Sequence, residues 1–446
     1  MTTKQRIAII GSGISGLSCA WLLQRSGHAI TVFEKDDRLG GHSNTVEIST
    51  TAGTTAVDTG FIVFNDKCYP NLVNLFKQLG VDSLATDMSF GVSLDDGRLE
   101  YSGSNSLATM FAQKRNLLRP RFWKMLSDLL RFYRESENWM ETLPDSMSLG
   151  ELLKRERFGA GFCDDHLLPM GAAIWSTPVN QMLAYPAKTF LRFCENHGLL
   201  QVKNRPTWRT VVGGSIEYVK RLSAPFEQHI KLNCGVSRVD RFEDHVIVVD
   251  DSGEAHRFDQ VVFACHADQA LAMLSQSSEA ERKTLGAFRY EENRAVLHCD
   301  PRLLPKRPTV WSSWNYMGDR QQGETKVSVS YWMNALQHLP CAEPIVVSLN
   351  PLTEPRARHV FREFSYQHPV FDGKALAAQT DLWALQGQQR SWFCGSYFGY
   401  GFHEDGIQSG LAVAERLGGG LRPWQVKPED DRINLPLPAE VSSSAA

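Results

Sequence analysis

Short apolar runs alternate with polar, glycine-rich segments at the start of the chain, and their order predicts a strand, a helix and a second strand. Residues 7–10 (IAII) form a run that is short and apolar enough for a strand buried on both faces. Residues 17–23 combine small and apolar side chains, as in a helix packed on a sheet, and residues 29–33 (AITVF) form a second strand-like run. The pattern therefore predicts a βαβ unit.

Three glycines between the first strand and the helix have the G-x-G-x-x-G spacing of a dinucleotide-binding loop. Gly11 allows a tight turn, Gly13 lets a pyrophosphate approach the backbone, and Gly16 lets helix and strand pack closely. The helix N-terminus offers N–H groups and a positive dipole end to the phosphates. Glu34, directly after the second strand, can accept hydrogen bonds from an adenosine ribose and disfavours a 2′-phosphate. The sequence thus predicts a dinucleotide site, and NADP is not the expected ligand.

The pattern farther along the chain predicts a second lobe and a return to the first. Residues 107–143 have helical periodicity, whereas residues 294–299, 309–314 and 327–332 alternate apolar and polar side chains like strands of a second sheet. Residues 261–264 and 392–394 are apolar runs typical of buried strands.

Composition agrees with a soluble protein of more than one domain. The 446 residues exceed one ordinary core, and a net charge of −3 gives no bias toward nucleic acid. Nine scattered cysteines without a C-x-x-C pair indicate a reducing compartment and predict neither a disulfide framework nor a metal site. No run reaches 18 apolar residues, and a strand within the first six residues leaves no room for a signal peptide. A cytoplasmic protein is expected.

Three motifs resemble those of the FAD-dependent amine oxidase, protoporphyrinogen oxidase and phytoene desaturase superfamily. Arg38-Leu39-Gly40-Gly41 resembles the R-x-G-G element, although His42 stands where that superfamily often has arginine. Val57-Asp58-Thr59-Gly60-Phe61 resembles the D-x-G element beside the flavin ring, and the segment from Trp392 to Gly410 resembles the closing element F-A-G … E-G-A-x-x-S-G.

The resemblance implies a fold, a cofactor and its ligands. The expected fold is an α/β, two-domain FAD-binding (Rossmann-like) flavoprotein of amine oxidase type. Its FAD-binding domain is expected at 1–90, 205–285 and 385–424, its mixed sheet-plus-helical substrate domain at 91–204 and 286–384, and a disordered tail at 425–446. FAD should be noncovalent, because no cysteine lies at the attachment position of the superfamily. The implied cofactor-binding residues are Gly11, Ser12, Gly13, Ile14, Ser15, Gly16, Glu34, Lys35, Arg38, Gly40, Gly41, His42, Asp58, Thr59, Gly60, Phe61, Val236, Ala264, Gly395, Asp405, Gly406 and Ile407.

Four residues are candidates for catalysis. His403 and Glu404 have the chemistry for proton transfer, and a helix-capping interaction is the alternative interpretation of this pair. Tyr400 is suited either to wall the substrate cavity or to pack in the core. Many amine oxidases of the superfamily hold a water against the flavin with a lysine on the first strand of the second sheet. Arg294 takes that place here, where its fixed charge fits the task poorly, and a surface strand residue is the alternative.

Two features point to lipid. Trp175-Ser176-Thr177-Pro178 and the run 399–406 resemble a bacterial subgroup of FAD oxidoreductases associated with cyclopropane-type fatty acyl methyltransferases, which implies an apolar substrate and such a methyltransferase as partner. Residues 107–140 interleave basic, aromatic and leucine side chains, which suits peripheral contact with an anionic membrane at its inner face. A helical lobe with a solvated basic face is the alternative.

Three functions follow from these expectations. The first is an FAD-dependent oxidoreductase that transfers hydride from a C–H of an unsaturated or methyl-branched fatty acyl chain to flavin, in the manner of a desaturase. The second is an amine oxidase acting on small amines, against which the arginine in place of lysine counts. The third is a redox-neutral or accessory flavoprotein in lipid modification.

Overall fold

The computed structural model describes residues 4–103, 107–175, 179–201, 205–320, 326–427 and 432–435. The chain divides into two compact units. The first unit comprises Met1–Gly41, Leu222–Arg289 and Lys374–Ala446, and the second comprises His42–Arg221 and Tyr290–Gly373. This division differs from the predicted domains, because residues 42–90 and 205–221 group with the second unit and residues 374–384 with the first.

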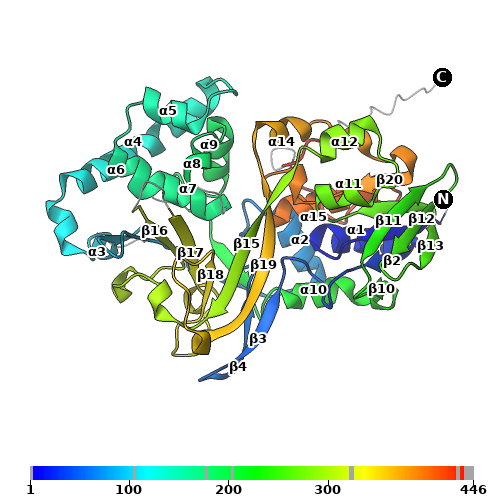
Figure 1. Cartoon of the computed structure of the whole chain (residues 1–446), viewed down its shortest axis with the longest axis horizontal. Helices are drawn as coiled ribbons and strands as arrows, with labels where there is room; N and C mark the ends of the chain where they lie inside the picture. The colour runs from blue at the N-terminus through cyan, green and yellow to red at the C-terminus, as the bar shows by residue number, and fades with distance from the viewer. Residues whose placement is uncertain are drawn as a thin grey trace. The chain divides into compact units, whose positions relative to one another are not determined.

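A five-stranded parallel sheet forms the centre of the first unit (Figure 1). Its order is β10 (Ile230–Lys231), β2 (Ala29–Phe33), β1 (Arg6–Ile10), β14 (Gln260–Phe263) and β20 (Ser391–Phe393). Ile10 lies level with Phe33 on one side and Phe263 on the other, so the carboxyl ends of these strands meet at one edge. The expected βαβ unit is confirmed, with its two strands parallel and their inner residues largely buried.

Two helices pack closely against each other beside this sheet. They are α1 (Ile14–Arg25) and α15 (His403–Arg416), which come from opposite ends of the chain. Glycine makes this contact possible, since a Cβ on Gly410 would lie 2.2 Å from the carbonyl oxygen of Ser15. The remaining elements of the first unit are η3 (Ala224–His229), β11 (Val236–Arg241), β12 (Val246–Asp250), β13 (Ala255–Phe258), α11 (Ala267–Met273), α12 (Glu279–Leu285), α14 (Gly373–Ala378, shared at its first residue with the second unit), η8 (Leu382–Leu385), η9 (Gln388–Arg390) and η10 (Ser396–Phe398).

A seven-stranded mixed sheet organises the second unit. Its order is β19 (Val360–Val370), β15 (Arg289–His298), β18 (Val346–Leu349), β17 (Lys326–Trp332), β16 (Trp314–Asp319), β7 (Phe90–Leu94) and β8 (Leu99–Ser102). The predicted strands at 294–299 and 327–332 are confirmed. The predicted strand at 309–314 is wrong, because Pro308 begins the short 3₁₀ helix η5 (Pro308–Val310) and the strand starts only at Trp314.

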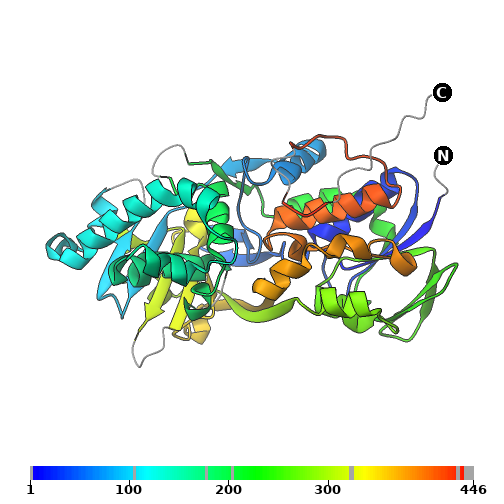
Figure 2. The same cartoon turned by 90° about the horizontal axis from the view of Figure 1, so that it is seen from above.

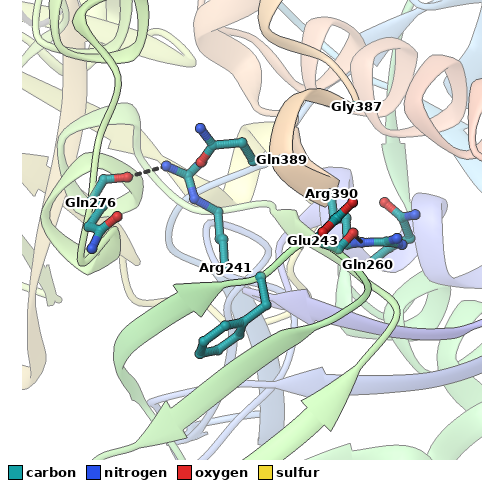
Figure 3. A pocket seen from close by; sticks show the side chains of 8 residues that line it. Arg241, Glu243, Gln260, Gln276, Gly387, Gln389 and Arg390 are labelled. Carbon is teal, nitrogen blue, oxygen red and sulfur yellow. Dashed lines mark hydrogen bonds between the residues drawn. The ribbon is translucent and has the colours of Figure 1, made fainter.

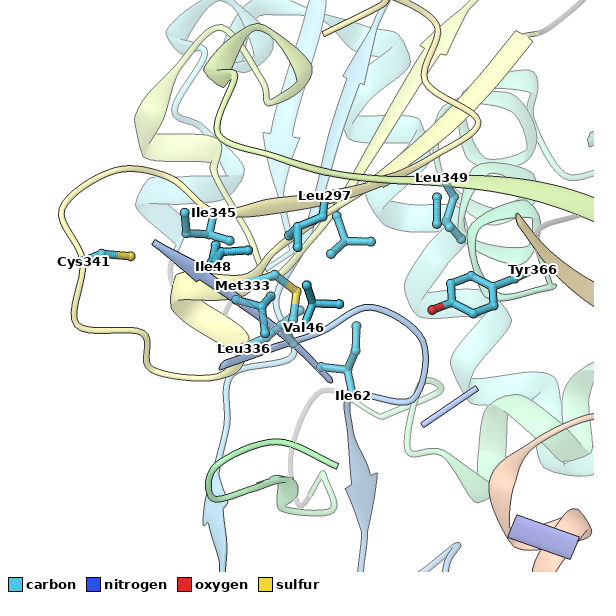
Figure 4. Close-up of a cluster of buried hydrophobic side chains, with 13 residues drawn as sticks. Val46, Ile48, Ile62, Leu297, Met333, Leu336, Cys341, Ile345, Leu349 and Tyr366 are labelled. Carbon is cyan, nitrogen blue, oxygen red and sulfur yellow. The ribbon is translucent and has the colours of Figure 1, made fainter. Parts of the chain in front are cut away.

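The apolar core of the second unit joins this sheet to a hairpin (Figure 4). The hairpin consists of β3 (Thr45–Thr50) and β4 (Gly53–Asp58), whose inward side chains meet Leu297, Met333 and Ile345. Further elements are β5 (Phe64–Asn65), α2 (Pro70–Leu79), β6 (Ser83–Ala85), β9 (Trp208–Val211), α10 (Ile216–Ser223, whose last two residues are counted in the first unit), η4 (Pro301–Leu303), α13 (Met333–Leu336) and η7 (Ala357–His359).

The helical region predicted from residue 107 onward is a lobe of the second unit (Figure 2, cyan to green). It contains α3 (Leu107–Met110), η1 (Lys114–Leu118), α4 (Pro120–Thr142), α5 (Leu149–Arg155), α6 (Ala160–Phe162), the π-helical η2 (Cys163–Leu167), α7 (Leu168–Trp175), α8 (Val179–Met182) and α9 (Ala187–Asn196). Residues 176–178 of the predicted subgroup motif lie outside the described residues. Within the described part of the chain, no helix combines the length and apolar character needed to cross a bilayer.

Candidate cofactor site and catalytic residues

The three glycines of the fingerprint have the tasks that their spacing predicts. A Cβ on Gly11 would lie 2.8 Å from the carbonyl oxygen of Ala264, and its φ of +104° also favours glycine. A Cβ on Gly16 would lie 2.0 Å from the carbonyl oxygen of Gly11, so α1 rests directly on the end of β1. At Gly13 a Cβ would meet no atom within 4 Å. The space above Gly13 is therefore open to a ligand.

The first turn of α1 borders this open space. Gly13 is the N-cap of the helix, and no side chain caps it. The helical ladder begins with the bond from the Leu17 amide to the Gly13 carbonyl, so the amides of Ile14, Ser15 and Gly16 have no intrahelical acceptor. Three N–H groups and the positive end of a helix dipole make this a site for an anion such as a diphosphate.

Glu34 directly follows β2, and hydrogen bonds to both of its carboxylate oxygens fix its side chain. One carboxylate oxygen accepts hydrogen bonds from the Ser12 amide (2.9 Å) and hydroxyl (2.5 Å), and the other accepts from the Asp36 amide (3.0 Å). The Cys234 amide donates to the Glu34 carbonyl (2.8 Å), which brings Val236 at the start of β11 near this strand end. Each carboxylate oxygen has two lone pairs, so Glu34 keeps acceptor capacity for a ribose.

The R-x-G-G element folds back over the glycine loop. The Gly40 amide donates to the Ser12 carbonyl (3.0 Å), and a Cβ on Gly41 would lie 3.2 Å from the Cα of Gly13. Both glycines have positive φ, 103° and 55°, which a larger residue would adopt only with strain. The other two predicted ligands of this turn are the half-buried Arg38 and the exposed Lys35.

The closing element reaches the same edge of the sheet. The Gly395 amide donates to the hydroxyl of Ser409 in α15 (3.0 Å), which ties the end of β20 to that helix. A Cβ on Gly406 would lie 2.9 Å from Ile14 and 3.0 Å from the hydroxyl of Ser15, so the first turn of α15 contacts the first turn of α1. Ile407 is fully buried in this contact region. Gly406 therefore meets Ile14 and Ser15, which lie 392 and 391 positions earlier in the sequence, as the motif predicts.

Asp405 serves the structure of α15. Its side chain is fully buried, accepts a hydrogen bond from the Phe402 amide (2.7 Å) and forms an ion pair with Arg432 (3.0 Å). Arg432 is a functional candidate that sequence reasoning missed, since it lies in the segment predicted to be disordered. The sequence signal was weak: Arg432 and Ile433 follow an acidic run in a tail rich in proline, serine and alanine.

The two candidates for proton transfer occupy the first turn of α15. Burial lowers the pKa of His403 to about 3, so its imidazole is neutral and takes up a proton only weakly at neutral pH. Its role in proton transfer stays a prediction. Glu404 is fully buried, and Tyr400 lies with its ring 5.4 Å from the Arg432 guanidinium carbon.

In the second unit, the D-x-G element is a junction between the hairpin and α10. The Asp58 carboxylate accepts hydrogen bonds from the Ser215 amide (2.9 Å), the Thr45 hydroxyl (2.6 Å) and the Gln337 amide group (2.9 Å). A Cβ on Gly60 would lie 2.1 Å from the carbonyl oxygen of His42, which the Phe61 amide also contacts. Asp58 thus has a structural task, and a cofactor contact at this element stays a prediction.

Replacing Asp58 by asparagine is expected to change stability in a pH-dependent way. Burial raises the pKa of Asp58 from an ordinary 3.8 to about 6, so its ionisation costs the folded state up to roughly 3 kcal/mol as pH rises from 4 to 7. Asparagine does not titrate. We therefore expect the stability advantage of the wild type over Asp58→Asn to be largest near pH 4 and to shrink toward pH 7 in urea unfolding. A difference independent of pH would contradict this account.

Arg294 is a surface residue, and its predicted catalytic place is wrong. Its guanidinium pairs with Glu354 (2.7 Å) and Glu363 (2.9 Å), and 40% of its side chain is exposed. The neighbours on β15, Asn293 and Ala295, are the residues that are fully buried. The alternative interpretation, a surface strand residue, is the one that the structure supports, because successive side chains of a strand lie on opposite faces.

A polar aromatic cluster in the second unit escaped the sequence analysis. The Tyr366 hydroxyl lies 2.7 Å from the Thr59 hydroxyl and accepts from the Asn44 amide group (2.9 Å), and its ring lies 5.0 Å from that of His42. Asn293 donates to Nδ1 of His368 (3.0 Å), so the neutral ring carries its proton on Nε2. The signal was the alternation on β19, which places Phe364, Tyr366 and His368 on one face.

Comparison with known proteins decides the family. A family model described as flavin containing amine oxidoreductase matches residues 14–290. The chain belongs to that family. Flavin-containing amine oxidase A of Sus scrofa is 23% identical over 330 residues, which are 70% of this chain and 58% of the relative. These matches cover more than half of this chain but only a little more than half of the length of each relative.

Solved structures of family type confirm the predicted fold class. The CLA-producing fatty acid isomerase from P. acnes has a TM-score of 0.66 at 15% identity, with 94% of this chain and 100% of that chain covered. Cyclohexylamine oxidase from Brevibacterium oxydans has a TM-score of 0.64 at 13% identity, with 93% and 100% covered. At these identities the likeness shows an α/β two-domain flavoprotein fold.

Membership in this flavin-containing family gives FAD as the cofactor, and the residues of the first unit fit it. Gly13 leaves open space beside three helix amides, where the diphosphate would be held. Glu34 offers its carboxylate at the adjacent strand end, where the adenosine ribose would bind. Cys394 is fully buried, and noncovalent binding of FAD stays a prediction.

A cavity of about 570 Å³ in the first unit lies at the other edge of the sheet (Figure 3). Gln260 begins β14 and Arg390 directly precedes β20, so they mark the amino ends of these strands. Arg241, which also lines the cavity, is neutralised by the buried Glu281 (2.5 Å). The cavity is thus distinct from the cofactor edge, which follows the carboxyl ends.

One group of metal-ligand type lies in the first unit. Atoms of Asp250, Glu254 and His256 come within 4.8 Å of one another. Asp250 already accepts hydrogen bonds from His256 Nε2 (2.9 Å) and from the amides of Ser252 and Glu254 (both 3.0 Å), and these bonds lower its pKa. The group is explained as a hydrogen-bonded turn between β12 and β13, and the absence of a metal stays a prediction.

Proposed function

We propose that this protein is an FAD-dependent oxidoreductase that desaturates the acyl chain of a lipid taken from an anionic membrane surface. In such a reaction the acyl chain loses one hydrogen as hydride and a neighbouring one as a proton. FAD supplies the two-electron acceptor, and a protein group receives the proton. The observation that carries the proposal is an exposed patch of leucine, tryptophan and unpaired cations in the helical lobe of the second unit.

The basic residues of α4 itself do not form this patch. Arg121 pairs with Asp165 (2.7 Å), Lys124 with Asp128 (2.7 Å), and Arg134 with Glu135 (2.9 Å). Because these charges are compensated within the lobe, most of α4 attracts an anionic surface only weakly. The membrane contact predicted for residues 107–140 is therefore proposed for a smaller region at the N-terminal end of α4.

The apolar part of the patch lies on η1 and the first turn of α4. Leu118 is 87% exposed, Leu117 is 49% exposed and Trp123 is 50% exposed. The Trp123 ring packs on Phe111 with 5.4 Å between ring centroids, and its indole N–H donates to the Leu117 carbonyl (2.9 Å). These contacts fix the Trp123 ring beside the two exposed leucines, and insertion into a lipid interface would bury all three side chains.

Cations surround these apolar side chains. Arg115 and Arg119 both donate to the carbonyl oxygen of Arg98, and Lys114 is exposed beside them. Burial and the like charges of Arg115 and Arg98 lower the pKa of Arg119, which shows how closely the cations are gathered. Among the described residues, none of the four has a carboxylate within 4 Å. Each such cation contributes on the order of 1 kcal/mol of attraction to an anionic membrane.

The patch can be tested by sedimentation with vesicles. We expect the protein to bind vesicles of phosphatidylglycerol and phosphatidylcholine, and we expect Leu117→Ser with Leu118→Ser to weaken binding at least about tenfold. Lys114→Glu with Arg115→Glu should remove the preference for anionic lipid. Leu421→Ser, at an 86% exposed leucine of the first unit, is the matched control and should bind like the wild type. Equal binding of all variants would contradict the proposal.

Two other activities remain candidates, each on a specific observation. The family and the porcine relative are described as amine oxidases, which favours amines. Because Arg294 lies on the surface, its presence no longer counts against amines. The strand β15 nevertheless contains no lysine, the residue that many amine oxidases of the superfamily have on this strand. The fold likeness to a fatty acid isomerase favours a redox-neutral reaction on lipid.

For either activity on lipid, we propose a cyclopropane-type methyltransferase as the partner, at the inner face of the membrane.

Anaerobic reduction of the purified flavoprotein separates these activities. Vesicles with unsaturated, methyl-branched or cyclopropane acyl chains and, separately, polyamines are mixed with the protein, and visible absorption and lipid mass are recorded. Bleaching with loss of two hydrogens from one lipid supports the proposal. Bleaching by amines alone overturns it in favour of amine oxidation. A lipid product of unchanged mass without net bleaching overturns it in favour of isomerisation.

A further inference from the structure

A short piece of the C-terminal segment is docked on α15. Residues 432–435 have defined positions, and Ile433 is only 6% exposed. The predicted disorder of residues 425–446 is therefore wrong for these four residues. The proline-, serine- and alanine-rich composition of the tail suggested disorder, whereas Arg432 pairs with Asp405 and Ile433 is buried.

Arg432 makes contacts from both its backbone and its side chain. Its amide donates to the side-chain oxygen of the fully buried Gln408 (3.1 Å). Its guanidinium approaches both oxygens of Asp405, at 3.0 Å and 3.4 Å, and lies over the rings of Tyr400 (5.4 Å) and Phe402 (6.0 Å). The side chain is 7% exposed and that of Asp405 is fully buried, so this is a buried ion pair with aromatic walls.

The buried carboxylate needs this cation. Burial raises the pKa of Asp405, whereas Arg432 and the amides of Phe402, Tyr400 and Gly401 lower it. Without Arg432, an ionised carboxylate would remain buried with only backbone amides to compensate its charge, which is strongly destabilising. Asp405 also crowds the chain before the helix, since a Cβ on Gly399 would lie 2.4 Å from its Oδ1. A displacement of Asp405 would therefore shift the first turn of α15.

The first turn of α15 is part of the cofactor edge. Gly406 directly follows Asp405 and contacts Ile14 and Ser15 in the first turn of α1, beside the open space at Gly13. We propose that the segment 432–435 is a strap in which Arg432 acts as a positioning residue: by neutralising Asp405 it holds the first turn of α15 against α1 and so keeps the FAD site in its binding conformation. This inference concerns cofactor binding and is independent of the lipid substrate.

The test is a double-mutant cycle on the apoprotein and on FAD reconstitution. We expect Arg432→Gln to lower the unfolding temperature of the apoprotein and to weaken FAD binding at least about tenfold, measured by flavin fluorescence. Arg432→Lys should lose less stability and less FAD affinity than Arg432→Gln, because lysine keeps the positive charge although it cannot approach both oxygens of Asp405 in the same way. The double variant Arg432→Gln with Asp405→Asn should recover most of the loss, since no buried charge remains.

The pH dependence separates charge neutralisation from simple packing. The ionisable groups around Asp405 are Arg432 from the tail, His403 and Glu404 on its own turn, and Tyr400 before the helix. A group with a raised folded pKa destabilises the fold as pH rises, so the defect of Arg432→Gln should be larger at pH 8 than at pH 5. A wild-type unfolding temperature and FAD affinity in Arg432→Gln would overturn the strap. A double variant no better than the single one, or a defect equal at both pH values, would overturn the electrostatic role of Arg432.

Discussion

Gly13→Asp is expected to abolish FAD binding while leaving the apoprotein as stable as the wild type. The aspartate has room, since a Cβ on Gly13 meets no atom within 4 Å, and the φ of −66° and ψ of 179° suit any residue. Aspartate is also a good N-cap and a favourable charge at a helix N-terminus. The same carboxylate would occupy the place of the diphosphate and repel it, so we expect FAD affinity to fall more than about 100-fold, roughly 3 kcal/mol.

The matched variant is Gly13→Asn, which has nearly the same size and capping ability but no charge. We expect it to bind FAD more weakly than the wild type and more tightly than Gly13→Asp, because only the steric effect remains. Affinity is measured by titration of the apoprotein with FAD, and stability by thermal unfolding without FAD. Unchanged FAD affinity in Gly13→Asp would show that the diphosphate does not approach this loop.

The cofactor edge could be predicted from the sequence because its rules are local. The roles of Gly11, Gly13 and Gly16 follow from their spacing within six residues. The structure shows close contacts at Gly11 and Gly16 and open space at Gly13. Glu34 could be placed by the end of a strand that is apolar on both faces. The return of residues 395–407 to this edge followed from a resemblance rather than from periodicity.

The sequence analysis failed where the role of a residue depends on the strand face on which it lies or on a partner far away in the sequence. Arg294 was proposed for the active site, but its partners Glu354 and Glu363 lie 60 and 69 positions later in the sequence, and the face of the strand on which it lies is set by the folded sheet. The docking of Arg432 depends on a carboxylate 27 positions earlier, so no local pattern shows it. Asp58 lies in a recognised motif, yet its task is set by Ser215, which only the folded chain brings within 2.9 Å.

Gly410→Ala is expected to destabilise the first unit and to weaken FAD binding with it. Alanine favours a helix interior over glycine by about 1 kcal/mol. This gain is outweighed, because the Cβ would lie 2.2 Å from the Ser15 carbonyl oxygen and 2.6 Å from the Ser18 hydroxyl, and backbone cannot move aside as a flexible side chain can. Separating α15 from α1 should cost a net of roughly 2–4 kcal/mol in urea unfolding of the apoprotein.

The control is Gly373→Ala at the first residue of α14, where a Cβ would meet nothing within 4 Å. This variant should be as stable as the wild type or slightly more stable, because only the helix preference acts. The loss of FAD affinity in Gly410→Ala should exceed that in Gly373→Ala, since α15 also carries Gly406 at the cofactor edge. If Gly410→Ala were as stable as Gly373→Ala, the two helices would not be in the close contact on which the positioning of the cofactor site depends.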